Sequence, residues 1–199
     1  MLNLAVFVSG SGSDLQSLID AIEKKELNAK IALVVASKPD IYAIERAKLN
    51  NIPSVVFQKA DFASAEFMYE ILAGTLEFYN IDLIVLAGYL KILTKNFVNI
   101  YKNRIINIHP SLIPKYCGNG FYGMKVHEAV INSKEKASGA TVHFVDEGTD
   151  TGKIILQETV PVFAEDTPQT LQKRVLELEH SLLPRAVKIV INDIIKEKK

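Results

Sequence analysis

Short apolar runs rich in valine and isoleucine alternate with segments of helical period, and this alternation constrains the fold more than any other feature. Four runs in the first half are strand candidates: Leu4 to Val8, Ile31 to Ala36, Val55 to Phe57 and Leu83 to Ala87. Runs that are apolar at every position indicate strands buried on both faces, joined by right-handed helical crossovers. The first half therefore predicts a doubly wound, Rossmann-like α/β fold, in which helices flank a mostly parallel sheet.

The second half predicts an antiparallel extension of that sheet. A strand at Ile105 to His109 is followed by SLIPKYCGNGFYG, a stretch with neither strand nor helix period that is too long for an ordinary connection. Two further strands, Ala140 to Val145 and Ile154 to Val162, flank the loop DEGTDTG and can pair as a hairpin. Loops as long as the one after Pro110 are usually functional or mobile.

Two helices have predicted ends. Ser13 followed by Gln16 fits a capping box, and four apolar residues then share one face: Leu15, Leu18, Ile19 and Ile22. Near the end of the chain, Thr167 is suited to cap a helix that Pro168 begins. Its apolar stripe consists of Leu171, Val175, Leu178 and Leu182. Pro184 should end or kink this helix before a second amphipathic stretch.

Charge and length restrict the classes of partner. The 199 residues contain 23 Lys and Arg against 23 Asp and Glu, which argues against the basic surface used by nucleic-acid and membrane binders. The length predicts one domain over residues 1–199. The start of the chain has no basic segment typical of a signal peptide, and no apolar run reaches the ~18 residues of a membrane span. We expect a cytoplasmic protein.

The single cysteine, Cys117, allows no intramolecular disulfide, which fits a reducing compartment. No His, Cys or carboxylate spacing resembles a zinc site, so no metal is expected. Cys117 has no evident histidine partner, which favours a chance cysteine over a nucleophile.

The junction VSGSGSDLQ is the first candidate site. Gly10 and Gly12 permit close backbone approach, while Ser11, Ser13 and the first helical N–H groups can direct donors at an anion. This predicts a phosphate cradle, although the spacing is neither G-x-G-x-x-G nor a Walker loop. A plain strand-to-helix turn fits the same residues. Asp14 is awkward beside a phosphate, yet the helix N-terminus would stabilise it.

The second candidate is the end of the strand at residues 105–109. Asn107 and His109 point to the same face, and Pro110 stops the strand, which leaves both at the carboxyl edge where open α/β sheets bind ligands. An amide donor beside an imidazole can stabilise an oxyanion and move a proton in acyl transfer. A histidine satisfied by backbone at a strand end is the competing interpretation.

The acidic loop at residues 146–152 is the third candidate. It reads either as a turn with solvated carboxylates or as the source of an aspartate that reaches His109, raises the pKa of its imidazole and fixes its tautomer. Among the other histidines, His127 and His180 are predicted to be surface or packing residues. His143 alternates with apolar neighbours on its strand and can face the pocket.

Three segments together, VSGSGSDLQ, NIHPSLIPKY and VHFVDEGTDTG with IILQETVPV, resemble the phosphoribosylglycinamide formyltransferases over essentially the whole chain. N-x-H-P-S-L-[LI]-P is shared by the wider folate-dependent formyltransferase superfamily. The resemblance implies transfer of a formyl group from the co-substrate 10-formyltetrahydrofolate to the amine of glycinamide ribonucleotide in purine biosynthesis. It implies a phosphate and ribonucleotide half at residues 1–100 and a folate and catalytic half at residues 101–199.

The resemblance also assigns residues to roles. The catalytic trio would be Asn107, His109 and Asp150, with His109 as the proton donor. The ribonucleotide would be bound by Gly12, Ser13, Asp14 and Glu179. The folate would be bound by Leu90, Lys91, Ile92 and Leu93, by Asn107, and by the loop Asp146, Glu147, Gly148, Thr149 and Asp150.

Four departures from the family pattern are visible. Asp14 stands where the phosphate loop usually has Asn, which favours backbone donors there. Lys91 replaces an Arg of some members, so a planar bidentate contact becomes a point charge. Ala65 replaces an Arg that can meet the glutamate tail of folate. The loop CGNGFYG differs from the PGLHTH type, so its contacts do not transfer.

Two relatives and one different class remain as alternatives. Methionyl-tRNA formyltransferase needs an RNA-binding domain and a positive surface, and formyltetrahydrofolate hydrolase carries an N-terminal regulatory domain. We expect neither of these additional domains here. A non-catalytic phosphate- or nucleotide-binding α/β protein would need only the glycine loop. The sequence leaves a monomer and a homodimer equally open.

Overall fold

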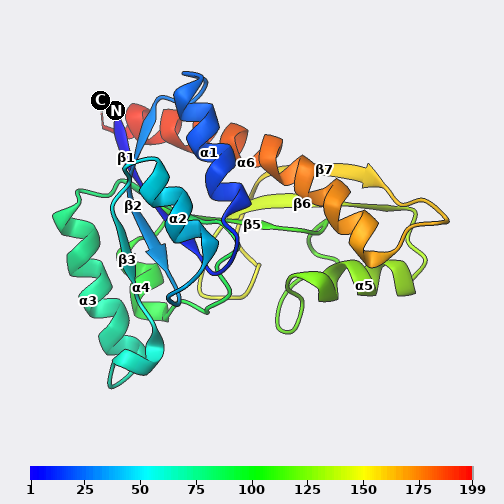
Figure 1. The fold of residues 1–199 in the computed structure, drawn as a ribbon, viewed down its shortest axis with the longest axis horizontal. Helices are drawn as coiled ribbons and strands as arrows, with labels where there is room; N and C mark the ends of the chain where they lie inside the picture. The colour runs from blue at the N-terminus through cyan, green and yellow to red at the C-terminus, as the bar shows by residue number, and fades with distance from the viewer. Residues whose placement is uncertain (199) are drawn as a thin grey trace.

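A computed structural model describes residues 1–198 (Figure 1). Its elements in chain order are β1 (Leu2–Val8), α1 (Ser13–Glu23), β2 (Ala29–Ala36), α2 (Tyr42–Leu49), β3 (Ser54–Val56), the 3₁₀ turn η1 (Lys59–Asp61), α3 (Ala65–Phe78), β4 (Leu83–Leu86), α4 (Lys95–Ile100), β5 (Ile105–His109), α5 (Met124–Asn132), β6 (Ala137–Phe144), β7 (Ile154–Pro161) and α6 (Pro168–Glu197).

The strands form one seven-stranded sheet in the order β3-β2-β1-β4-β5-β6-β7. The first five pair in parallel, whereas β6 runs antiparallel to both β5 and β7. The predicted α/β class, with its antiparallel extension in the second half, is therefore confirmed. The order in which strands are added to the sheet changes direction between β1 and β4, and sheets of this kind bind ligands in the crevice at such a point.

Helices cover both faces of the sheet and create two apolar cores. Leu4 and Val6 of β1 point to a core shared with α1, α2 and α6, while Ala5 and Phe7 point to a core shared with α3 and α4. This alternation follows from the two-residue period of a strand. Because both faces of β1 are buried, the strand contains no polar residue after Asn3.

The start of α1 differs from the predicted capping box. Gly12 is the N-cap, in a left-handed conformation with φ of 73°, and no side chain caps the helix. A Cβ at Gly12 would lie 2.7 Å from the Cβ of Ala43, so α1 and α2 approach closely only because residue 12 is glycine. The start of α1 is therefore set by a glycine that lets the two helices pack closely, and not by a side-chain cap.

The prediction for Pro184 is wrong as to the helix end. Thr167 and Thr170 form a reciprocal capping box and Pro168 begins the helix as predicted, but α6 continues for 30 residues with Pro184 inside it. Leu183, Ala186 and Val187 are fully buried around the proline, so tertiary packing holds the helix across the lost hydrogen bond.

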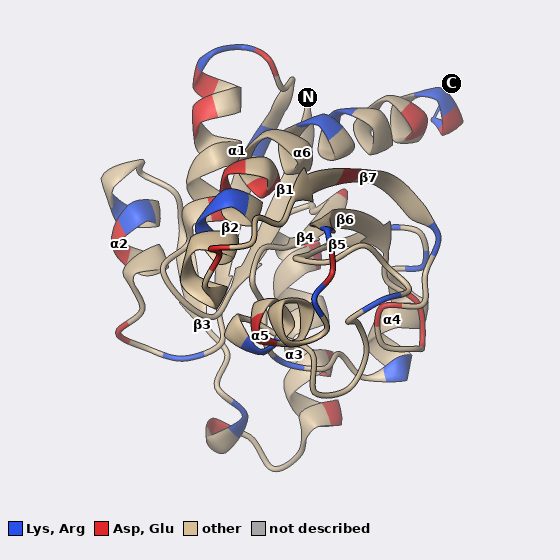
Figure 2. Ribbon diagram, turned by 90° about the vertical axis from the view of Figure 1, so that its right-hand side faces the viewer, with Lys and Arg blue, Asp and Glu red and all other residues tan. Residues whose placement is uncertain are grey.

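Basic and acidic residues are interspersed along the ribbon (Figure 2). No helix in the described part of the chain is long and apolar enough to cross a bilayer. Strand bounds move slightly from those predicted, since β3 ends at Val56 and β6 begins at Ala137.

Candidate active site

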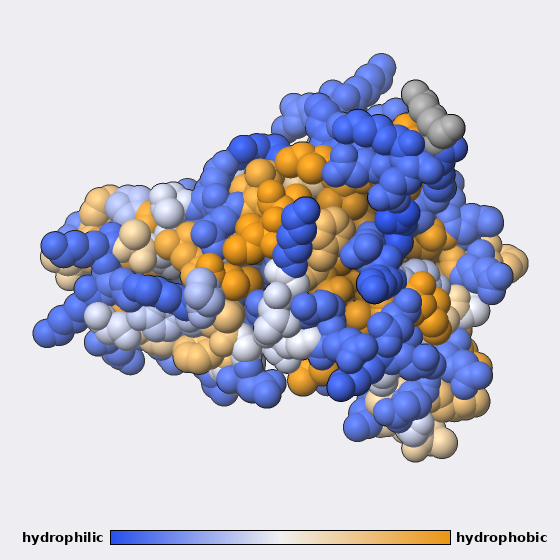
Figure 3. Space-filling model, turned by 180° about the vertical axis from the view of Figure 1, so that it is seen from behind, coloured by the Kyte–Doolittle hydropathy of each residue, from blue (hydrophilic) through white to orange (hydrophobic). Residues whose placement is uncertain are grey.

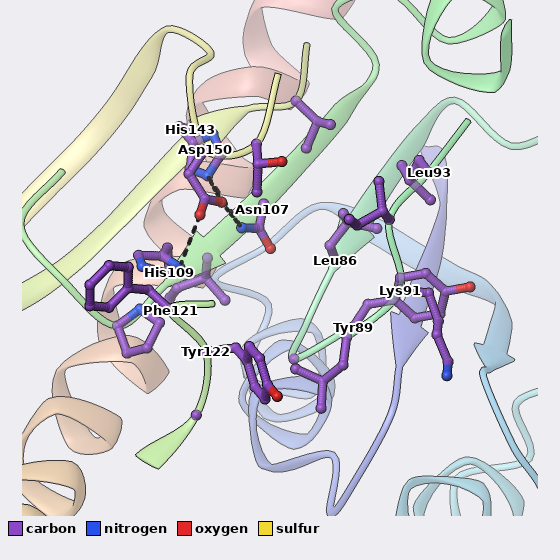
Figure 4. Close-up of a pocket in the computed structure, with 18 of the residues that line it drawn as sticks. Leu86, Tyr89, Lys91, Leu93, Asn107, His109, Phe121, Tyr122, His143 and Asp150 are labelled. Atoms are coloured by element: carbon purple, nitrogen blue, oxygen red, sulfur yellow. Dashed lines mark hydrogen bonds and ion pairs between the residues drawn. The ribbon is translucent and has the colours of Figure 1, made fainter. Parts of the chain in front are cut away.

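A cavity of about 440 Å³ lies where the carboxyl ends of β4 and β5 meet the loops before α5 and β7 (Figure 4). Apolar side chains line much of it, among them Leu86, Leu93, Val98, Val145 and Phe121. Exposed apolar residues on its rim include Leu90 and Ile92, and Figure 3 shows hydrophobic atoms gathered in the middle of one face, framed by hydrophilic ones. The cavity combines an apolar wall with a few polar groups, as small-molecule sites do.

Asn107, His109 and Asp150 meet at one wall of this cavity, as Figure 4 shows. His109 Nδ1 lies 3.7 Å from Asp150 Oδ2. Asn107 Nδ2 lies 3.5 Å from Asp150 Oδ1 and 3.2 Å from His143 Nε2. The antiparallel pairing places His143 of β6 directly opposite Asn107 of β5, so the sheet extension supplies a fourth polar side chain.

The hydrogen bonds determine the tautomers of both histidines. His109 Nε2 lies 2.9 Å from the carbonyl oxygen of Tyr116, which only accepts, so Nε2 carries a proton. His143 Nδ1 likewise donates to the carbonyl of Phe144 at 2.8 Å, and His143 Nε2 lies 3.2 Å from Asn107 Nδ2 and 3.5 Å from Asp150 Oδ1. The proton that His109 can release is therefore the one on Nδ1, the atom that faces Asp150.

Burial and the Asp150 charge act on His109 in opposite directions. Burial lowers the pKa of the His109 imidazole and outweighs the carboxylate of Asp150 and the Tyr116 carbonyl, which raise it. The prediction that an aspartate of the acidic loop reaches His109 and raises the pKa of its imidazole is confirmed, but burial outweighs this effect because His109 is only 5% exposed. The imidazole loses its proton more readily than a free histidine.

Asp150 is held as a carboxylate. Burial alone would raise its pKa, but His143, His109 and the backbone N–H of Gly118 together lower the pKa of Asp150 below its usual value. Gly118 donates to Asp150 Oδ2 at 2.9 Å, which ties the loop between β5 and α5 to the loop between β6 and β7. Both irregular segments therefore meet at the carboxylate.

The predicted ribonucleotide residues divide between two places. Asp14 and Glu179 line the cavity and are each 8% exposed, whereas Ser13 lines a separate hollow between α1, α2 and α6. Gly12 lines neither the cavity nor the hollow; it is the N-cap of α1 and lets this helix approach Ala43 of α2. Ser9 connects this end to the apolar wall, because its Oγ accepts from Leu90 N at 2.9 Å.

All nine predicted folate-binding positions in the two loops line the cavity: Leu90, Lys91, Ile92 and Leu93 on one side, and Asp146, Glu147, Gly148, Thr149 and Asp150 on the other. Lys91 is exposed, so its charge can meet a ligand at the rim. Ala65 begins α3 behind the Ser64 cap and does not line the cavity.

Sequence reasoning missed several cavity residues. His127, predicted to be a surface or packing residue, is 2% exposed and lines the cavity, and burial lowers the pKa of its imidazole to about 4. Tyr89, Phe121 and Tyr122 also line it. Tyr89 follows the carboxyl end of β4, which is a detectable signal, whereas the two aromatic residues in the long loop carry no periodicity that marks them.

Cys117 does not line the cavity. The Cys117 thiol donates to the carbonyl of Pro114 at 3.3 Å, and burial raises its pKa, which disfavours a thiolate nucleophile. Within residues 1–198, no three His, Cys, Asp or Glu side chains are grouped as metal ligands would be.

A buried imidazole, an amide and a carboxylate at the carboxyl edge of a doubly wound sheet define a class of acyl-transfer site. Comparison with known proteins identifies the family: residues 2–187 match the model of the formyl transferase family. The chain is 40% identical over 188 residues to phosphoribosylglycinamide formyltransferase of Haemophilus influenzae, covering 94% of this chain and 86% of that protein. The chain belongs to the formyl transferase family.

Other relatives agree in fold but differ in extent. The crystal structure of phosphoribosylglycinamide formyltransferase from Bacillus halodurans superposes with a TM-score of 0.89 at 34% identity, covering 95% of each chain. The trifunctional purine biosynthetic protein adenosine-3 of Drosophila melanogaster is 42% identical over 191 residues. That match covers 95% of this chain but 14% of the fly protein, so this chain corresponds to one part of it.

Proposed function

We propose that the chain transfers the formyl group of 10-formyltetrahydrofolate to the amine of glycinamide ribonucleotide, a step of purine biosynthesis. The observation that carries the proposal is the convergence of Asn107, His109 and Asp150 in a cavity that apolar Leu93 and the buried carboxyl of Glu179 also line. The relatives named above support the choice of both substrates.

The cavity provides different surroundings for the two substrates. We place the flat ring system of the folate against the apolar segment Leu90 to Leu93 and the loop at residues 146–150, and the ribonucleotide at the Asp14 and Glu179 end. The first backbone N–H groups of α1 have no acceptor within the helix, so they can bind the phosphate. Residues 1–100 then supply the phosphate loop and residues 101–199 the catalytic trio, within one formyltransferase domain.

In the proposed mechanism the amine nitrogen attacks the formyl carbon, and the carbonyl oxygen becomes an oxyanion. Asn107 Nδ2 is placed to donate to this oxyanion, because its contact with Asp150 at 3.5 Å is long and can be exchanged for a stronger one. His109 gives its Nδ1 proton to the folate nitrogen as the carbon–nitrogen bond breaks. The proton lost by the attacking amine restores His109, so no covalent enzyme intermediate forms.

Asp150 and Tyr116 make His109 an effective acid in this scheme. The carboxylate favours the protonated imidazole, and the Tyr116 carbonyl retains the Nε2 proton, so only Nδ1 exchanges. Burial keeps the pKa of His109 low enough for release of the proton to a weakly basic nitrogen. We further propose that the enzyme acts in the cytoplasm, as a monomer or homodimer, without nucleic-acid or membrane partners.

The test is formation of tetrahydrofolate from 10-formyltetrahydrofolate, measured with and without glycinamide ribonucleotide. We expect turnover only when the ribonucleotide is present, and a loss of about 1,000-fold or more in His109→Ala and about 100-fold in Asn107→Ala. Asn132→Ala, an amide removed from the exposed end of α5, is the matched control and should retain full activity. Turnover without the ribonucleotide would indicate a hydrolase instead, and no turnover under either condition would indicate a binding protein.

A further inference from the structure

Two buried carboxyl groups line the same cavity as the catalytic trio. Asp14 is the second residue of α1, and Glu179 projects from α6; both line the cavity and both are 8% exposed. Asp14 Oδ1 is fully buried and receives no hydrogen bond from residues 1–198. An unpartnered buried carboxylate oxygen is costly when charged, so this oxygen needs either a proton or a ligand that donates to it.

The groups that face Asp14 do not neutralise a second negative charge. From α6, His180 Nε2 lies 3.9 Å from Asp14 Oδ1, but burial, together with Arg46, lowers the pKa of His180, so this imidazole is uncharged at neutral pH. Arg46 of α2 donates to the Ser11 carbonyl at 2.9 Å and to the Gln16 side chain at 3.0 Å.

Ionisable groups of both signs lie near this corner: Lys24 and Arg185 line the hollow beside His180 and Arg46, and so do Asp20 and Glu26. Asp20 of α1 and Glu177 of α6 both raise the pKa of His180. Burial raises the pKa of Asp14 to about 6, and burial with the charge of Asp14 raises the pKa of Glu179 well above its usual value. Both effects favour a proton on the Asp14–Glu179 pair.

A bound phosphate adds two negative charges beside this pair. The N–H groups at the start of α1 attract the phosphate, and the same α1 terminus carries the Asp14 side chain, so an ionised Asp14 and a phosphate dianion occupy neighbouring positions. We propose that the Asp14–Glu179 pair admits the phosphate end of the substrate only together with a proton, so that affinity for the phosphorylated substrate falls as the pH rises above neutral. This inference rests on the proposed ribonucleotide site.

The structure assigns the proton to Asp14 for a specific reason. Asp14 is the second residue of α1, beside the N–H groups that attract the phosphate, and asparagine has the same shape as aspartate but cannot ionise. Asp14→Asn therefore removes the proton requirement while keeping the helix start. Asp20→Asn, on the same helix and hydrogen-bonded to Gln16 at 2.8 Å, is the matched control.

Isothermal titration calorimetry provides the test, with glycinamide ribonucleotide and with ribose 5-phosphate, which lacks the titrating amine. For the wild type we expect Kd to rise up to about tenfold per pH unit between about pH 6.5 and 8, with uptake of roughly one proton, shown by the dependence of the binding enthalpy on the buffer. Asp14→Asn should show less than half of that uptake and bind several-fold more tightly at about pH 8. Asp20→Asn and His180→Gln should retain the wild-type slope.

Several outcomes would overturn the inference. Equal Kd values for the wild type at about pH 6.5 and 8, or an unchanged slope in Asp14→Asn, would exclude a proton on the carboxyl pair. Loss of the slope in His180→Gln would assign the proton to the imidazole instead. Failure of glycinamide ribonucleotide to bind even near pH 6 would overturn the ribonucleotide site itself, which separates the failure of the proposed function from the failure of this inference.

Discussion

Replacing Asp150 by Asn tests how strongly this carboxylate favours the protonated form of His109 against the burial that lowers its pKa. The two groups are 3.7 Å apart between Nδ1 and Oδ2, a separation at which opposite unit charges attract by about 4.5 kcal/mol at an effective dielectric constant of about 20. That energy corresponds to about 3 pKa units as an upper bound. Since burial already lowers the pKa of His109, loss of the carboxylate should lower it further by about 1 to 3 units.

The sign of the effect on rate follows from the role of His109 as an acid. Activity should fall as the pH rises through the pKa of His109, and in Asp150→Asn that decline should occur at lower pH. At about pH 7.5 we expect kcat to fall about 100-fold, with little change in ribonucleotide binding. Asn retains an oxygen that can accept from Gly118 N, so the loop should keep its position.

The assay is kcat for tetrahydrofolate formation between about pH 5.5 and 9, for the wild type, Asp150→Asn and the control Asp193→Asn, which makes the same change on the exposed face of α6. The control should match the wild type at every pH. A variant Asp150→Asn with kcat within about threefold of the wild type and an unshifted profile would refute the electrostatic account of this pair.

Three further predictions concern stability, and all use urea unfolding. Gly12→Ala should lower the free energy of unfolding by about 2 kcal/mol, because the left-handed backbone and the Cβ of Ala43 2.7 Å away both oppose a side chain. Gly10→Ala is the control, because its new Cβ meets open space, and it should change the free energy of unfolding by less than about 0.5 kcal/mol. Equal effects of the two substitutions would contradict the packing argument. The free energy of unfolding of Asp14→Asn should equal that of the wild type near pH 4 and exceed it by on the order of 2 kcal/mol at pH 8. The reason is that a carboxyl whose pKa rises from 3.8 to about 6 on folding stabilises the protein only at low pH. Equal stability of the variant and the wild type at pH 8 would contradict this. Pro184→Ala should raise the free energy of unfolding by about 1 kcal/mol, because alanine restores a backbone donor inside α6, and a lower value would show that the proline ring packs favourably.

Periodicity predicted the parallel half of the fold well because the strands β1, β2 and β4 are apolar at nearly every buried position. It failed at Gly12 and Pro184 for a common reason. A local rule for helix ends was overridden by packing between distant segments, against Ala43 in one case and around Leu183 in the other. Such contacts depend on three-dimensional arrangement, which local patterns do not contain.

The site was predictable where chemistry followed strand geometry. Asn107 and His109 alternate at the end of one strand, which places them on one face without knowledge of the loops. The contact of His109 with the Tyr116 carbonyl was not predictable, because a backbone oxygen has no sequence signature. The net pKa of His109 also required the structure, since burial and the Asp150 charge oppose each other and only their relative size decides the result.

The long helix α6 also bears on the order in which the protein folds during synthesis. Its buried residues from Leu182 to Ile194 complete the apolar core beneath β1 and α1, although they lie more than 150 residues after α1 in the chain. Until they leave the ribosome, that face of the earliest strands lacks its cover. The amino-terminal half therefore cannot reach its final stability before these residues are translated, and truncation before Leu182 should give a chain that associates with chaperones rather than a smaller folded domain.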